Sequence, residues 1–238
     1  MVKTGRSAWR LARMLGWIIL LVGVLPAMIG CSQKAPNDAS EKKAQAPAPV
    51  YTGTIVAVGD SLTAGLGVAA DQAYPAQLAR RLHADGYHYR VVNAGVSGET
   101  SSGALSRIQW VISSLAPDIV ILETGANDGL RGLDPRLLEA NLDRLVSRLQ
   151  AAHIEVILAG MRMLPNLGPE YTRAFERVYP RIARKYGVIF IPFFLEGVAG
   201  KARLNQADGL HPTAEGYARI VRAIYPYVIK AIKGAGKK

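Results

Sequence analysis

The chain of 238 residues contains a single cysteine, Cys31, so it cannot form a disulfide bond within itself. A chain of this length buries a core large enough to fold without one. The glycine-rich segment 59–67 contains neither of the common phosphate-binding patterns, G-x-x-x-x-G-K-[ST] and G-x-G-x-x-G. The sequence also lacks zinc-finger spacing, a helix-turn-helix signal and the aromatic and basic motif of RNA-binding sheets. These absences count against a disulfide scaffold, a nucleotide-binding module and a nucleic-acid partner.

Acidic residues are missing from the first 30 residues, where four basic residues precede an apolar run over 14–30. This pattern predicts a signal peptide over residues 1–30. The run ends at Gly30-Cys31-Ser32, which resembles the lipobox of bacterial lipoproteins, with Cys31 as the lipidated first residue. An uncleaved anchor helix and plain secretion are the alternatives, and all three export the chain. Ser32 after the cysteine favours the outer membrane of a Gram-negative cell, on its periplasmic face.

Residues 31–50 contain almost no large apolar side chain, which predicts a flexible tether before a domain over residues 51–238. The formal net charge is +11, of which about +7 remains without residues 1–30. Such an excess favours contact with anionic lipid or with cell-envelope polymer, and general solubility explains it equally well. The oligomeric state is left open.

Short apolar runs alternate with segments of helical periodicity from residue 54 onward. The predicted strands are Thr54–Val58, Tyr89–Val92, Asp118–Leu122, Glu155–Leu158 and Val188–Ile191. The predicted helices are Tyr74–His83, Ala104–Leu115, Pro135–Ala151, Glu170–Tyr186 and Thr213–Ile232. This alternation predicts a flavodoxin-like three-layer α/β/α sandwich with a five-stranded parallel sheet. In such sheets the functional site lies beyond the carboxyl ends of the strands.

Two motifs near the ends of the predicted domain supply the parts of a nucleophilic site. Gly59-Asp60-Ser61-Leu62 follows the first strand, and Asp208-Gly209-Leu210-His211-Pro212 precedes the last helix. A serine hydroxyl attacks well only when an imidazole takes its proton, and a carboxylate orients that imidazole. We therefore predict Ser61 as nucleophile, His211 as base and Asp208 as the orienting acid, although in isolation Ser61 also suits a helix N-cap.

Two further loops contain groups suited to stabilising an oxyanion. Glycine at Gly98 lets a backbone N–H approach a ligand closely, and the Asn127 carboxamide can donate a hydrogen bond without carrying charge. The backbone N–H of Ser61 is the third predicted donor. We expect Asp128 to bind loop backbone, because a carboxylate beside an oxyanion would oppose it. An ordinary N-capped loop is the alternative explanation around Gly98.

Gly59-Asp60-Ser61-Leu62, Gly98, Asn127-Asp128 and Asp208-x-x-His211-Pro212 together resemble the sequence blocks of the GDSL or SGNH hydrolases. The resemblance spans about Thr54 to Tyr225. Within that family it is strongest to the periplasmic bacterial enzymes that combine acyl-CoA thioesterase, arylesterase and lysophospholipase activities. The resemblance carries one departure inside the motifs, since Ala126 stands where those enzymes have glycine.

The resemblance implies a serine esterase that forms an acyl-enzyme on Ser61, with no cofactor and no metal. It implies acyl ester, thioester or lysophospholipid substrates, and an acyl-binding groove bordered by Leu130 and by the apolar loop of Met163, Leu164 and Pro165. The other three histidines, His83, His88 and His153, are predicted to be non-catalytic.

Two alternatives to the lipolytic interpretation remain open. A carbohydrate O-acetylesterase acting on envelope polysaccharide would use the same residues with a small acyl pocket. A lipoprotein that binds acyl chains without turnover would need no nucleophile, so the joint presence of Ser61, Asn127, Asp208 and His211 counts against it.

Overall fold

The computed structural model describes residues 50–235. The predicted signal peptide, Cys31 and the predicted tether up to residue 49 lie outside these residues and stay predictions, as does the domain boundary at residue 51. Within residues 50–235, no helix combines the length and the apolar character needed to cross a bilayer.

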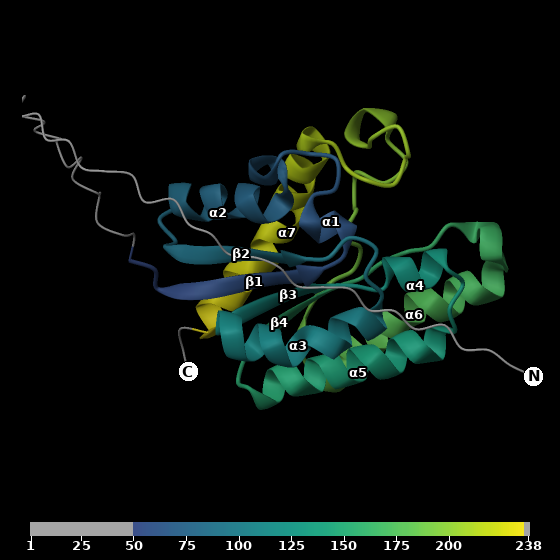
Figure 1. Ribbon diagram of the computed structural model, residues 1–238, viewed down its shortest axis with the longest axis horizontal. Helices are drawn as coiled ribbons and strands as arrows, with labels where there is room; N and C mark the ends of the chain where they lie inside the picture. The colour runs from purple at the N-terminus through teal and green to yellow at the C-terminus, as the bar shows by residue number, and fades with distance from the viewer. Residues whose placement is uncertain (1–49, 236–238) are drawn as a thin grey trace, which may run out of the picture. The chain divides into compact units, whose positions relative to one another are not determined.

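Five parallel strands form one sheet in the spatial order β2-β1-β3-β4-β5 (Figure 1). The strands are β1 (Gly53–Gly59), β2 (Tyr89–Gly95), β3 (Ile119–Glu123), β4 (Glu155–Ala159) and β5 (Ile189–Ile191). Ile55 of β1 lies between Val91 of β2 and Ile119 of β3 in register. This strand order is that of flavodoxin-like folds, so the predicted fold class is confirmed.

Helices cover both faces of the sheet (Figure 1). The longer helices are α2 (Tyr74–Ala84), α3 (Ser101–Leu115), α5 (Pro135–Ala151), α6 (Gly168–Tyr186) and α7 (Ala214–Ala235). Helices α3, α5 and α6 pack together on one face, and α2 packs with α7 on the other. Every residue of β3 is buried because the strand is covered on both sides, which explains its continuous apolar sequence.

The structure also contains short helical segments that the sequence pattern does not predict. They are α1 (Ser61–Ala64), α4 (Ala126–Leu130) and the 3₁₀ turns η1 (Ala70–Gln72), η2 (Pro165–Leu167) and η3 (Ala202–Leu204). Segments of one turn are too short to show helical periodicity, so apolar spacing cannot reveal them. Strand β3 also continues one residue beyond its predicted end, to the buried Glu123.

The carboxyl ends of the strands meet at one edge of the sheet, and α1 is packed tightly against that edge. A Cβ atom built on Gly95, the last residue of β2, would lie 2.2 Å from the backbone nitrogen of Ala64. Only a residue without a side chain permits this approach of two backbones. The contact fixes α1, and with it Ser61, at the edge where the loops converge.

Candidate active site

Ser61, His211 and Asp208 form one hydrogen-bonded chain at this edge. Ser61 is the first residue of α1, directly after β1, and its Oγ lies 2.8 Å from Nε2 of His211. The Nδ1 of His211 lies 2.6 Å from Oδ2 of Asp208. A carboxylate only accepts hydrogen bonds, so Nδ1 carries the ring proton. In the neutral ring Nε2 is then free to accept from the Ser61 hydroxyl.

The turn that carries Asp208 and His211 is closed by its own hydrogen bonds. Oδ1 of Asp208 accepts from the backbone N–H groups of Leu210, at 2.9 Å, and His211, at 3.0 Å. These donors and the imidazole lower the pKa of Asp208 to about 2, with the backbone N–H of His211 as the largest cause. Asp208 is therefore ionised throughout the physiological pH range, as an orienting carboxylate must be.

A loop and the short helix α4 bring Gly98 and Asn127 to the cavity that Ser61 also lines. Gly98 lies between β2 and α3 with a backbone φ of +78°, a conformation that favours glycine, and Asn127 lies in α4. The Nδ2 of Asn127 donates to the carbonyl of Glu99, at 3.0 Å, and to Oδ2 of Asp60, at 3.2 Å. Both hydrogens of the carboxamide thus have acceptors in the structure.

Arg131, which the sequence analysis did not single out, contacts this loop. It follows α4 directly, and its Nη2 donates to the carbonyl of Gly98 at 2.8 Å. Asp128 binds the start of α3 instead of the site, since its Oδ2 accepts from the backbone N–H of Ser101 at 2.8 Å. That arrangement agrees with the expectation that Asp128 binds backbone.

Two buried carboxyl groups lie under Ser61. Burial is the main cause that raises the pKa of Asp60 to about 6, and burial together with the neighbouring Asp60 raises the pKa of Glu123 well above its usual range. Oε2 of Glu123 accepts from the Thr63 hydroxyl at 2.8 Å. Burial therefore disfavours the charged form of the Glu123 carboxyl group.

The site residues line one cavity of about 600 Å³. Ser61, Gly98, Asn127, Asp208 and His211 lie along its wall. The apolar part of the wall includes Leu66, Leu130, Met161, Met163, Leu164, Phe193, Leu195 and Leu210. The structure therefore brings eight of the predicted site residues together. A cavity of this size and character suits an apolar ligand with one polar end.

The predicted substrate loop contributes to this cavity only in part. Met163 and Leu164 line the cavity, and so does Leu130 of α4. Pro165, the first residue of η2, is not among the described residues that line it. Phe193, which sequence reasoning missed, also lines the cavity, and its ring centroid lies 4.8 Å from the guanidinium carbon of Arg162. Its only signal was an apolar run after the last strand, which does not reveal which side chain faces the site.

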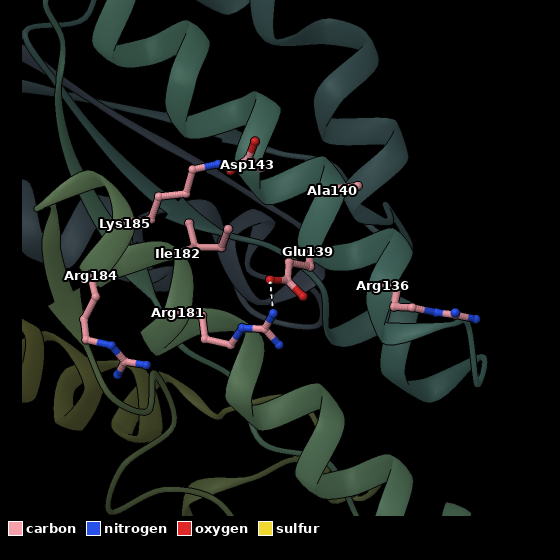
Figure 2. Close-up of a pocket in the computed structure, with 8 residues that line it drawn as sticks. All are labelled: Arg136, Glu139, Ala140, Asp143, Arg181, Ile182, Arg184 and Lys185. Carbon is pink, nitrogen blue, oxygen red and sulfur yellow. Dashed lines mark hydrogen bonds and ion pairs between the residues drawn. The ribbon is translucent and has the colours of Figure 1, made fainter.

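A second large hollow lies between α5 and α6, away from these residues (Figure 2). Charged side chains surround it, and they are largely paired with one another. Arg181 lies 2.9 Å from Glu139, and Lys185 pairs with Asp143. None of the predicted site residues lines this hollow, so it is separate from the predicted site.

The remaining histidines lie outside the cavity that Ser61 lines. Nε2 of His83 lies 3.0 Å from the carbonyl oxygen of Tyr89, and neither His88 nor His153 lines the cavity. Residues 50–235 contain no group of three or more histidine, cysteine or acidic side chains arranged to hold a metal ion.

Comparison with known proteins gives a consistent result. The family model described as GDSL-like Lipase/Acylhydrolase family matches residues 57–219. Esterase TesA of Pseudomonas aeruginosa is 42% identical over 173 residues, which cover 73% of this chain and 86% of that protein. Thioesterase 1/protease 1/lysophospholipase L1 of Escherichia coli K12 is 37% identical over 162 residues, which cover 68% of this chain and 76% of that protein. The crystal structure of AlinE4, an SGNH-hydrolase family esterase, matches with a TM-score of 0.64 and 44% identity, covering 75% of this chain and 96% of that one.

Proposed function

Because the chain belongs to the GDSL-like lipase and acylhydrolase family, and is therefore an enzyme that hydrolyses acyl esters, we propose that it does so through a covalent acyl-enzyme on Ser61. The observation that carries the proposal is the hydrogen-bonded chain from Ser61 through His211 to Asp208, with contacts of 2.8 and 2.6 Å. These distances are within the range required for proton transfer.

In the first half-reaction, Ser61 Oγ attacks the carbonyl carbon while Nε2 of His211 takes the hydroxyl proton. The tetrahedral intermediate collapses when His211 gives that proton to the leaving alcohol or thiol, which leaves the acyl group on Ser61. Water then attacks the acyl-enzyme with the same help from His211 and releases the carboxylic acid. Asp208 keeps its charge throughout and stabilises the imidazolium.

The negative oxygen of each intermediate needs donors that are already in place. We assign this role to the backbone N–H groups of Ser61 and Gly98 and to the Asn127 carboxamide. As the first residue of α1, Ser61 has an N–H that no helical carbonyl accepts. The Asn127 carboxamide donates to two acceptors, and its contact with Oδ2 of Asp60 is the longer of the two. When the oxyanion forms, it accepts this N–H in place of Asp60.

We propose acyl lipids, including lysophospholipids, as substrates. The apolar wall supports this, because Leu130, Met163, Leu164 and Phe193 surround a cavity of about 600 Å³ beside Ser61. The exposed leucines at its mouth, Leu66, Leu130, Leu164 and Leu210, are each at least 40% exposed and suit a long acyl chain better than a sugar.

A chain-length series tests the substrate assignment. We expect kcat/KM of the full chain on p-nitrophenyl esters to rise from acetyl to medium or long acyl chains, because each buried methylene adds favourable transfer energy. Continuous absorbance at matched substrate concentrations measures this. Activity confined to the acetyl ester would instead indicate polysaccharide O-deacetylation, and absence of turnover on every ester would indicate a binding lipoprotein.

We also propose that the enzyme is exported and held at the cell envelope through a lipid on Cys31. The support is the sequence pattern alone, since residues 1–49 are outside the described part. In cells fed an alkyne fatty acid, the wild-type chain should be labelled and sediment with membranes, and Cys31→Ser should be unlabelled. An unlabelled wild-type chain in the membrane fraction would indicate an anchor helix, and one in the soluble fraction would indicate plain secretion.

A further inference from the structure

The loop that carries Gly98 has little to hold it in place by itself. Residues 96–98 are exposed and lie between the end of β2 and the start of α3. One backbone hydrogen bond, from the N–H of Glu99 to the carbonyl of Val96 at 3.0 Å, closes the turn around Gly98. A donor to an oxyanion must keep its position to within a fraction of an ångström, so the loop needs an external support.

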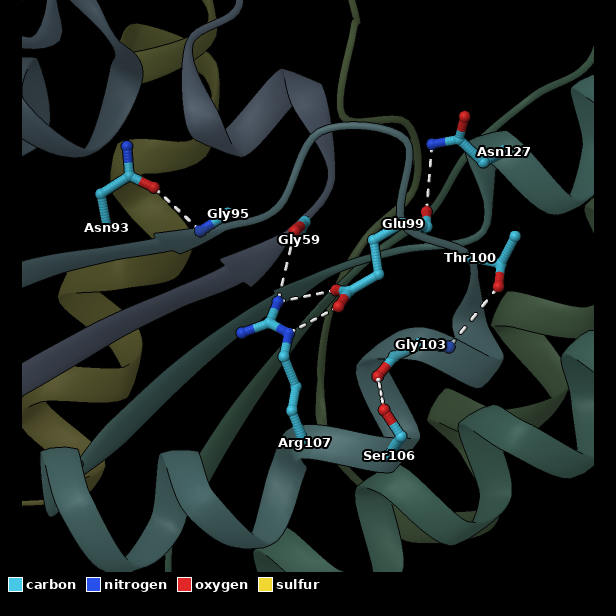
Figure 3. Close-up of polar contacts among 9 residues, drawn as sticks. All are labelled: Gly59, Asn93, Gly95, Glu99, Thr100, Gly103, Ser106, Arg107 and Asn127. Atoms are coloured by element: carbon cyan, nitrogen blue, oxygen red, sulfur yellow. Dashed lines mark hydrogen bonds and ion pairs between the residues drawn. The ribbon is translucent and has the colours of Figure 1, made fainter. Parts of the chain in front are cut away.

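Arg131 supports the loop at the carbonyl of Gly98. Glu99 supplies a second support through a two-pronged ion pair with Arg107 of α3 (Figure 3). Oε1 of Glu99 accepts from Nε of Arg107 at 2.6 Å, and Oε2 accepts from Nη2 at 2.7 Å. The side chain of Glu99 is only 7% exposed and that of Arg107 is 19% exposed. A buried pair with this fork geometry contributes little net stability, but it defines direction and distance closely.

The same two residues also contact two other parts of the site, the end of β1 and Asn127 of α4 (Figure 3). Nη2 of Arg107 approaches the carbonyl of Gly59, two residues before Ser61, at 3.5 Å, and that carbonyl also accepts from the N–H of Val96 at 2.9 Å. The carbonyl of Glu99 accepts from Nδ2 of Asn127 at 3.0 Å. The backbone of Glu99 thus contacts the Gly98 turn and Asn127 of α4, and its side chain contacts α3.

A glycine in α3 leaves the space that the Glu99 side chain occupies. A Cβ atom on Gly103 would lie 2.7 Å from Cγ of Glu99, a distance that real Cβ contacts do not show. The first turn of α3 therefore accommodates the carboxylate arm as it passes toward Arg107.

We propose that the Glu99–Arg107 ion pair is a positioning device that sets the places of Gly98 and Asn127 relative to Ser61. Glu99 fixes the rotation of the Asn127 carboxamide through its carbonyl and holds the Gly98 turn through its N–H, while Arg107 holds Glu99. The two side chains carry opposite charges, so the pair has no net charge. The inference rests on the proposed function, because it assigns the pair a role only in supporting those two donors.

Steady-state kinetics on a p-nitrophenyl ester tests the positioning role in the full chain. We expect Glu99→Gln to lower kcat about 10-fold or more with KM changed less than about 3-fold, because the lost alignment matters most in the transition state. Glu99→Asp keeps the charge and should recover most of the activity. As a matched control, Arg181→Gln removes an exposed ion-pair partner far from the site and should leave kcat unchanged.

A double-mutant cycle with Asn127→Ala separates positioning from general stability. If Glu99 acts partly through Asn127, the effect of Glu99→Gln on kcat should shrink at least 3-fold in the Asn127→Ala background. Unchanged kcat in Glu99→Gln, or the same loss in both backgrounds together with a matching loss of folded protein, would overturn the positioning role alone. Full activity of Asn127→Ala would overturn the oxyanion assignment itself.

Glu99→Gln alone leaves the Arg107 charge without its partner, and this can unfold the chain. A double variant that removes both charges therefore serves as a further test. Glu99→Gln combined with Arg107→Gln removes both charges together and leaves no lone buried charge. We expect it to fold, as judged by circular dichroism, and still to show the loss in kcat. A folded double variant with wild-type kcat would overturn the proposal.

Discussion

Replacing Ser61 with alanine should lower kcat for ester hydrolysis by about 10³-fold or more, because no acyl-enzyme can form without its hydroxyl. The change should leave the fold intact. The Ser61 Oγ has His211 as its hydrogen-bond partner, and the turn around His211 is held separately by Asp208. Initial rates on a p-nitrophenyl ester, with active sites counted by a fluorophosphonate probe, measure the effect.

A serine elsewhere on the surface supplies the control. Ser113 lies on α3, and its hydroxyl donates to the carbonyl of Trp110 in the same helix, so Ser113→Ala should keep wild-type activity. The fluorophosphonate should label the wild type and the Ser113 variant once each, and it should not label Ser61→Ala. Residual activity of a few per cent in purified Ser61→Ala, with labelling retained, would show that another nucleophile performs the reaction.

The second large effect is expected for Asp208→Asn, which should lower kcat by about 10³-fold with little change in KM. The amide oxygen of asparagine can still accept from the N–H groups of Leu210 and His211, so the turn should persist. Its NH₂ group then faces Nδ1 of His211 and forces the proton onto Nε2, which can no longer accept from Ser61. The variant therefore tests the tautomer rather than the loop.

Asp71, an exposed aspartate in η1, provides the matched control for this change, and Asp71→Asn should be fully active. Proton NMR of the imidazole in the two variants would report the tautomer independently of turnover. Since the pKa of Asp208 is lowered to about 2, the wild-type carboxylate stays ionised across an assay range of pH 5 to 8. If Asp208→Asn kept activity within 10-fold of the wild type, the carboxylate would not be needed to orient His211.

The fold could be predicted from the sequence because its main signals are local. Apolar runs such as Thr54–Val58 mark strands that are buried on both faces, and the alternation of strands with helices restricts the topology to a few choices. The positions at which the strands end were harder to predict from the sequence. Glu123 is an acidic residue inside a buried strand, and burial raises the pKa of its carboxyl group, which no hydrophobic pattern reveals.

The sequence by itself determined the five-stranded parallel sheet and the chemical character of the residues that we predict to be catalytic. The pairing of Asp208 with His211 is also local, since the two are three residues apart in one turn. Only the tertiary structure decided that His211 meets Ser61 across 150 residues, that Phe193 rather than Pro165 lines the cavity, and that Arg107 supports Glu99. The physical reason is that propensity and periodicity act along the chain, whereas these contacts depend on how separate strands and helices pack at one edge of the sheet.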